Sequence, residues 1–238
     1  MILITRPKEQ SKNLETVLNL KGYKTYLESL YKIKYLKKKV FYNKNNHYIF
    51  PSIHSVQSLI NSKQIKNFRE ANILAIGKKV KQKLINAGCK KIIATFNNSN
   101  ALIDKIKKNK STNCSFVYLC SNIINEDFLK QTDRYQVKLQ KKIIYKTIPV
   151  LKFQKKIIKD LKLGNISGAT FLSKLASDTF LSLSSRHNCL SASKNINIYC
   201  ISQRVAAPFI QKRFSSVYIA PKPNEDALIQ SIKKRHFK

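Results

Sequence analysis

Short apolar runs alternate with amphipathic stretches along almost the whole chain. Residues 2–4 are continuously apolar, as in a strand that is covered on both faces. In the stretch that follows, Leu14, Val17 and Leu18 share one helical face, and Gly22 closes it. The same change from an apolar strand-like run to a helical pattern recurs along the chain to the C-terminus. Strands that alternate with short helices predict parallel sheets built from right-handed βαβ units.

Further elements follow from the same periodicities and from serine, glycine and proline at their ends. We expect strands at residues 23–27, 48–50, 73–76, 91–94, 116–120, 137–148, 169–172, 196–200 and 217–220. We expect helices over residues 52–60, 80–87, 101–106, 125–131, 153–161, 173–180, 202–210 and 224–232.

The two halves of the chain also resemble each other. Ser52 matches Ser173 at an offset of 121 residues, and Val80 matches Val205 at an offset of 125. A drift this small is what loops of different length produce. The repeat predicts two α/β lobes, each a flavodoxin-like, doubly wound parallel sheet. Residues 1–30 with 149–238 would form lobe 1 and residues 36–141 lobe 2, and residues 31–35 and 142–148 would be two linker strands.

The segment 141–149 carries β-branched residues and one aromatic residue, and it ends at Pro149. Proline pushes the residue before it out of helical space, so the segment is expected to be extended. If it connects two lobes, Tyr145 lies at the mouth of the cleft between them. An ordinary strand aromatic that packs against a lobe edge is the alternative.

Composition limits the classes of protein to which the chain can belong. No run of about 18 apolar residues occurs, which predicts no membrane span, and the N-terminus does not resemble a secretory signal. The five cysteines have irregular spacing, which favours reduced thiols over disulfides or a zinc site.

The net charge of +34 has three interpretations: nucleic-acid binding, attraction of an anionic small molecule, or a general use of lysine. Lysines are spread over nearly every segment and arginines are few. This distribution favours the third interpretation for most of the charge.

Hydroxyl-bearing or small residues follow several predicted strands. In open α/β sheets, ligands bind beyond the carboxyl ends of the strands, where helix N-termini offer N–H groups to anions. Dinucleotide, Walker and nucleophile-elbow signatures are missing, and the four histidines lack metal spacing and are predicted to be solvated. The candidate anion-binding residues are Ser52, Gly77, Ser121, Ser173 and Ser202.

Together these pieces resemble the uroporphyrinogen-III synthase family over nearly the whole chain. The order and spacing of seven short segments carry the resemblance: residues 2–7, 49–52, 74–77, 144–147, 170–173, 200–206 and 220–223. Two departures are Val80, where a hydroxyl residue is common, and Pro51, where threonine is frequent.

The resemblance implies a cofactor-free, cytoplasmic enzyme with two lobes, a two-stranded linker and a cleft between the lobes. We also expect a monomer, and the spacing of the cysteines and histidines predicts no metal site. It would convert hydroxymethylbilane to uroporphyrinogen III, with loss of water and inversion of ring D. The family's junction tyrosine falls on Tyr145, which could donate a proton to the departing hydroxyl. The family's strand-end serines fall on Ser52 and Ser173. A basic nucleic-acid-binding protein and a non-catalytic two-lobed small-molecule binder remain alternatives.

Overall fold

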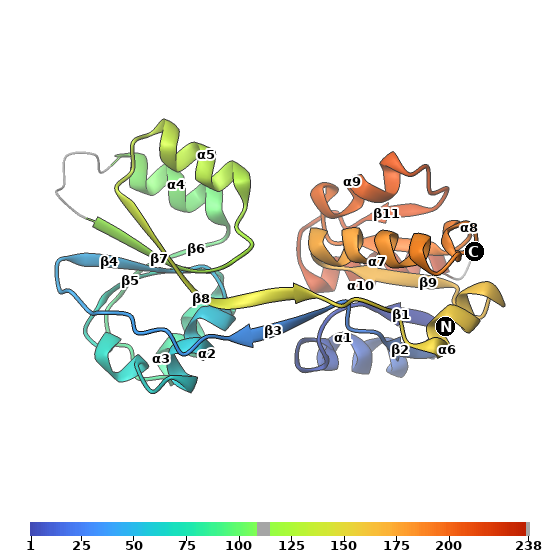
Figure 1. Cartoon of the computed structure of the whole chain (residues 1–238), viewed down its shortest axis with the longest axis horizontal. Coiled ribbons are helices and arrows are strands. Elements are labelled where there is room, and N and C mark those ends of the chain that lie inside the picture. The colour runs from blue at the N-terminus through green and yellow to red at the C-terminus, as the bar shows by residue number, and fades with distance from the viewer. Residues whose placement is uncertain (109–114, 237–238) are drawn as a thin grey trace. The chain divides into compact units, whose positions relative to one another are not determined.

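The computed structural model describes residues 1–108 and 115–236. It divides the chain into unit 1, residues 1–32 with 148–238, and unit 2, residues 33–147 (Figure 1). The division falls inside two strands, β3 (Tyr31–Tyr35) and β8 (Leu139–Pro149). The linker role of residues 31–35 and 142–148 stays a prediction.

Unit 1 contains a five-stranded sheet in the order β11-β10-β9-β1-β2, and all of its neighbours are parallel. The first strand, β1, therefore lies inside the sheet between β2 and β9, and β9 comes about 165 residues later in the chain. The strands are β1 (Ile2–Ile4), β2 (Thr25–Leu27), β9 (Gly168–Phe171), β10 (Asn197–Cys200) and β11 (Val217–Ile219).

Unit 2 contains a six-stranded sheet in the order β3-β8-β7-β4-β5-β6. From β8 to β6 all neighbours are parallel. The remaining strands are β4 (Asn46–Phe50), β5 (Asn72–Ile76), β6 (Ile92–Phe96) and β7 (Ser115–Ser121).

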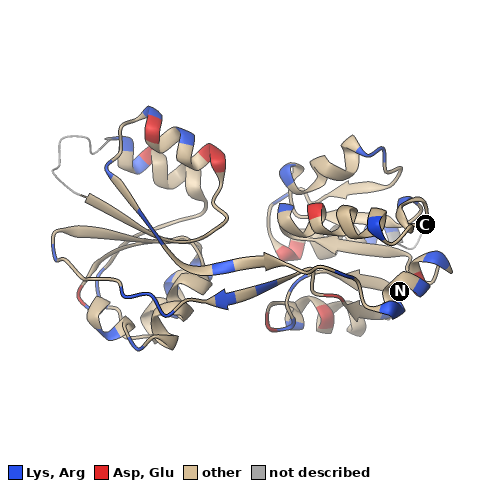
Figure 2. Ribbon diagram, in the orientation of Figure 1, with Lys and Arg blue, Asp and Glu red and all other residues tan. Residues whose placement is uncertain are grey.

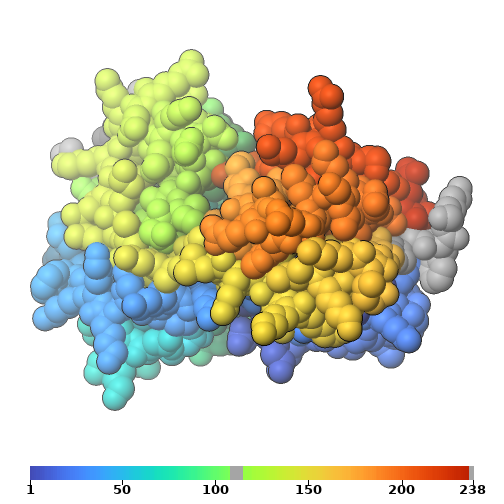
Figure 3. Space-filling view, turned by 45° about the vertical axis from the view of Figure 1, so that its right-hand side comes forward, coloured from blue at the N-terminus to red at the C-terminus, as the bar shows by residue number. Residues whose placement is uncertain are grey.

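Helices cover both faces of each sheet (Figure 1). Leucines of α1 and α10 pack on one face of the unit 1 sheet, and phenylalanines of α7 and α9 pack with Phe171 on the other. Side chains of α6, α7 and α9 hide the strands of this unit in the space-filling view (Figure 3). The helices of unit 1 are α1 (Lys8–Leu20), α6 (Lys155–Lys162), α7 (Lys174–Arg186), α8 (Leu190–Lys194), α9 (Gln203–Gln211) and α10 (Glu225–His236).

In unit 2, α2 and α3 cover one face of the sheet and α4 and α5 cover the other. The helices are α2 (Ile53–Asn61), α3 (Lys78–Asn86), α4 (Ser99–Lys108), α5 (Glu126–Arg134) and a 3₁₀ turn, η1 (Ile65–Phe68). The prediction of two doubly wound α/β lobes is confirmed.

The sequence repeat has a structural counterpart. When β4 is matched with β9, the two sheets share one spatial order, β8-β7-β4-β5-β6 and β2-β1-β9-β10-β11. Ser52 and Ser173 then follow matched strands and begin the matched helices α2 and α7. In unit 2 the two positions that precede β4 in this shared order are filled by the later strands β8 and β7, whereas in unit 1 the matching positions before β9 are filled by the N-terminal strands β2 and β1.

Positive charge is distributed over most elements of both units (Figure 2). Within residues 1–108 and 115–236, no helix is long and apolar enough to cross a membrane.

A buried carboxylate in unit 1 predicts a pH-dependent stability. Glu28 is 3% exposed, and one of its oxygens accepts from the Gln154 N–H at 3.1 Å, while Oε2 has no partner within the described residues. Burial raises the pKa of Glu28, so the folded state binds this proton more tightly than the unfolded state. The stabilising contribution is therefore present below the unfolded pKa and is lost as pH rises through the folded pKa.

We expect Glu28→Gln to increase the free energy of unfolding at neutral pH by about 1 kcal/mol, the low end of the cost of an unpaired buried polar group. The gain should disappear near pH 4, where the glutamic acid is protonated as well. Thermal unfolding at both pH values measures this, with Glu9→Gln on the exposed surface of α1 as the control. A gain of the same size at both pH values would contradict the prediction.

Candidate active site

Tyr145 owes its position to a β-bulge in β8. The register between β7 and β8 shifts between Cys120 and Ser121, so that Cys120 pairs with Ile143 but Ser121 pairs with Tyr145. The skipped residue, Ile144, therefore points to the same face as Tyr145. Ile143 packs with α4 and α5, whereas Ile144 and Tyr145 both pack with α2 and α3. Bulges often re-aim a side chain beside a functional site.

The bulge is held by hydrogen bonds from two neighbouring segments. The Ile144 carbonyl accepts from the Ser58 hydroxyl at 2.6 Å and from the Leu36 N–H at 2.9 Å. Ser58 is buried in α2, so this contact ties the bulge to the helix that begins at Ser52.

The Tyr145 hydroxyl lies beside the start of α2. Its side chain is 6% exposed, and the Ser52 hydroxyl forms a hydrogen bond with the phenol. Burial raises the pKa of Tyr145 to about 12, and the bond with Ser52 acts in the opposite direction. The phenol therefore keeps its proton at neutral pH, and Ser52 can stabilise the phenolate that would form once that proton is given away.

A histidine and a second tyrosine complete this cluster. His54 donates its N–H to the Ser52 hydroxyl at 3.2 Å, its ring lies 5.7 Å from the Tyr145 ring, and its Nδ1 lies 3.0 Å from the Tyr35 hydroxyl. The prediction of a solvated His54 is wrong, because the ring lies between two tyrosines of β3 and β8. The sequence signal that could have placed His54 at this site is its position two residues after Ser52, which caps α2.

Ser121 lies at the end of β7, on the strand next to Tyr145. Its hydroxyl lies 3.1 Å from that of Thr147 and 2.9 Å from Asn122 Oδ1, and the same amide oxygen accepts from the Thr147 N–H at 2.8 Å. These bonds hold the end of β8 just beyond Tyr145. Ser52, Ser121 and Tyr145 are thus brought to one edge of the unit 2 sheet.

Gly77 lies at the same edge, between β5 and α3, with φ +97° and ψ 141°. A side chain at such angles is strained whatever the space around it, and the nearest neighbour of an added Cβ would be Val80 Cγ2, 4.0 Å away. We expect Gly77→Ala to lower the free energy of unfolding by about 2 kcal/mol through the backbone alone. Urea unfolding measures this, and an unchanged midpoint would contradict the prediction.

The other two candidate residues belong to unit 1. Ser173 caps α7, and its hydroxyl accepts from the Ala176 N–H at 3.2 Å. Ser202 occupies the same position at α9, but its side chain makes no capping bond. Both lie at the carboxyl edge of the unit 1 sheet, after the adjacent strands β9 and β10.

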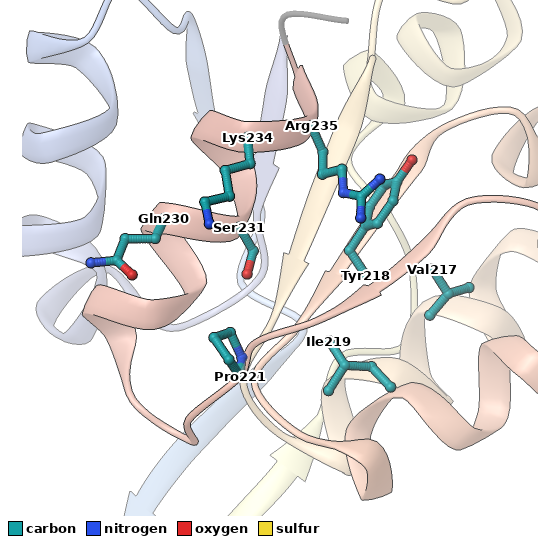
Figure 4. Close-up of a pocket in the computed structure, with 8 residues that line it drawn as sticks. All are labelled: Val217, Tyr218, Ile219, Pro221, Gln230, Ser231, Lys234 and Arg235. Carbon is teal, nitrogen blue, oxygen red and sulfur yellow. The ribbon is translucent and has the colours of Figure 1, made fainter.

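A groove of about 390 Å³ lies elsewhere in unit 1, between β11 and α10 (Figure 4). The Arg235 guanidinium lies over the Tyr218 ring, 5.4 Å from its centroid, and Ser231 and Gln230 project from α10. None of the predicted site residues lines this groove. Within the described ranges, no three His, Cys, Asp or Glu side chains are grouped as metal ligands would be.

The role of Ser58 in holding the bulge can be tested by measuring both the free energy of unfolding and kcat. We expect Ser58→Ala to lower the free energy of unfolding by about 1 kcal/mol, because the Ile144 carbonyl loses one of its two partners. It should also lower kcat, because the bulge then holds Tyr145 less firmly against Ser52. Ser62→Ala is the matched control, since that hydroxyl donates to carbonyls of its own helix. Equal effects of the two variants would argue against the role.

These features define a two-unit α/β protein with a tyrosine–serine site at the carboxyl edge of one parallel sheet. Residues 12–230 match the family model described as uroporphyrinogen-III synthase HemD. The chain belongs to the uroporphyrinogen-III synthase family, which makes it a cyclising lyase of haem biosynthesis. A nucleic-acid-binding protein or a non-catalytic binder is therefore not favoured.

Two solved structures share the fold. One is uroporphyrinogen-III synthetase from Helicobacter pylori, at 17% identity and a TM-score of 0.65, with 98% of each chain covered. The other is a mutant uroporphyrinogen III synthase from the extremely thermophilic bacterium Thermus thermophilus, at 10% identity and a TM-score of 0.63, also with 98% of each chain covered. No curated protein sequence matches the chain.

Proposed function

We propose that the enzyme cyclises hydroxymethylbilane to uroporphyrinogen III and that Tyr145 donates the proton that turns the departing hydroxyl into water. The observation that carries this role is the bulge at Ile144, which directs the phenol toward Ser52 instead of the opposite face of the sheet. A phenol with a pKa of about 12 is fully protonated at neutral pH, as a general acid must be.

The proton balance of this scheme closes. The pyrrole electrons expel the hydroxyl, which takes the Tyr145 proton and leaves as water. The resulting phenolate is stabilised by the hydrogen bond from Ser52. The substituted ring-D carbon bonds to the freed methylene and forms a spiro intermediate, and its original bond to the bridge carbon next to ring C then breaks. The unsubstituted carbon of ring D bonds to that bridge carbon, which closes the inverted macrocycle, and it loses its proton, which can return to the phenolate. The net change is the loss of one water molecule.

Positioning of the substrate is the second contribution. The bilane cyclises unaided to the wrong isomer, so the protein must bring the substituted ring-D carbon to the reactive methylene. We propose that Ser52, Gly77, Ser121, Ser173 and Ser202 bind the substrate with their hydroxyls or with backbone N–H groups at the helix N-termini. Because the Tyr145 ring is almost fully buried, the substrate would reach the phenol from the side of the half-buried Ser52.

We also propose a monomer that works in the cytoplasm. Cys89, Cys120, Cys189 and Cys200 are unpaired and buried, which suits a reducing compartment; Cys114 lies outside the described residues.

The decisive test is the isomer that the enzyme forms. Purified protein would be given freshly generated hydroxymethylbilane, and the products oxidised and separated. We expect predominantly the type III isomer, with type I in a protein-free control. Type I product alone in the presence of protein would contradict the proposed function.

A further inference from the structure

We propose that Arg6, Tyr31 and Ser173 form a carboxylate-binding site in unit 1 that anchors one carboxylate arm of the substrate. This inference rests on the proposed function and adds a charged anchor to it. Arg6 follows β1 and Ser173 follows β9, and these two strands are neighbours in the sheet. The site therefore lies at the carboxyl edge, where open α/β sheets bind ligands.

The three side chains are in direct contact. Tyr31 is 8% exposed, and its hydroxyl forms hydrogen bonds with the Ser173 side chain and with the Arg6 guanidinium. Burial raises the pKa of Tyr31, against smaller opposing effects of Arg6 and Ser173, so the phenol remains a donor at neutral pH. Arginine and a phenol together match the acceptor pattern of a carboxylate.

The guanidinium is held in place before any ligand arrives. Arg6 Nη1 donates to Glu225 Oε2 at 2.9 Å, and Nη2 donates to Gln10 Oε1 at 3.3 Å. Glu225 is fixed in turn by Asn13, whose Nδ2 donates to Oε1 at 2.5 Å. Such pre-organisation lowers the entropic cost of binding. Arg6 keeps 22% of its side chain exposed, so a ligand can still reach it.

Unit 2 has a comparable tyrosine–serine pair, but no guanidinium is bonded to it. Tyr145 contacts Ser52 after β4, as Tyr31 contacts Ser173 after the matched strand β9, but the partners of Tyr145 are Ser52, His54 and the strand β7. A neutral pair suits proton donation, whereas a pair joined to a guanidinium suits an anion. The same pair of residue types would thus have two different roles in the two units.

Glu225 allows a test in which two variants, Glu225→Gln and Arg6→Gln, change the affinity for an anion in opposite directions. It offsets the charge of Arg6, so Glu225→Gln should leave a stronger field for an incoming carboxylate, while the amide oxygen still accepts from Arg6. Arg6→Gln removes the guanidinium. If the network were only structural, neither change would tighten binding of an anion.

The probe is uroporphyrin III, the oxidised product with eight carboxylates, titrated into the full-length protein and followed by its fluorescence. We expect Arg6→Gln to weaken its Kd about tenfold and Tyr31→Phe to weaken it less, as for a charge-assisted and a neutral hydrogen bond. Glu225→Gln should tighten it. Lys8→Gln is the control for loss of net charge, because Lys8 is exposed two residues after Arg6. Thermal unfolding of each variant checks that it is folded.

Equal weakening by Arg6→Gln and Lys8→Gln would overturn the proposal, and so would weaker binding by Glu225→Gln. The experiment also distinguishes failure of this carboxylate site from failure of the proposed function. If the protein forms type III product but Arg6→Gln changes neither the KM nor the uroporphyrin Kd, the site is wrong and the function stands. If no type III product forms while the variants shift the uroporphyrin Kd as expected, the site stands and the function is wrong.

Discussion

Tyr145→Phe is expected to lower kcat about 100-fold, the lower range for loss of a general acid, with little change in KM. Only the hydroxyl is removed, so the ring still fills its place among the core residues that α2 and α3 cover. Because the pKa of the phenol is raised to about 12, this group should not titrate between about pH 6 and pH 9. The measurement is the initial rate of type III formation across that range.

Tyr118→Phe is the matched control for this substitution. Tyr118 is a buried tyrosine on the adjacent strand β7, but it packs on the opposite face of the sheet, against Phe128. We expect it to leave kcat within about twofold of the wild type, since its ring packs on the opposite face of the sheet and Tyr145 is only the smallest of the causes that raise the pKa of Tyr118. A Tyr145→Phe variant with an unchanged rate would remove the proposed donor while leaving the family assignment intact.

Phe180→Ala is expected to have the largest effect on stability, a loss of about 3–5 kcal/mol in the free energy of unfolding. Phe180 is fully buried on α7, and its ring lies 5.3 Å from Phe171 and 5.6 Å from Phe153. Truncation leaves a cavity among aromatic rings that belong to the sheet and to the segment following β8. A fall in Tm on the order of 10 °C should accompany it.

Leu20→Ala is the control for this truncation, because Leu20 ends α1 with 81% of its surface exposed. Its effect should stay within about 0.5 kcal/mol. Urea unfolding followed by circular dichroism measures both variants. A loss below about 1 kcal/mol for Phe180→Ala would show that the core of unit 1 collapses around the missing ring, contrary to the behaviour expected of a closely packed interior.

The sequence alone determined the type and order of most elements, although it did not predict α8 or η1. Short apolar runs, such as residues 48–50 and 198–200, specify buried parallel strands because both of their faces are covered. Serines after such runs specify helix starts because their hydroxyls satisfy free N–H groups, and Ser52 and Ser173 do so. The repeat of these local signals was enough to predict two lobes.

Only the tertiary structure decided which face each side chain of β8 occupies and which residues meet at the sheet edge. Strict alternation would place Tyr145 opposite Ile144, but the one-residue shift against β7 puts both on the side of α2. Nothing in the local sequence signals that shift, and one of the groups that bind the bulge, the Ser58 hydroxyl, lies 86 residues away from Ile144. The contact of Arg6 with Glu225 likewise joins residues 219 positions apart. Periodicity reports the local environment of a residue, whereas partners of this kind are set by strand order and register.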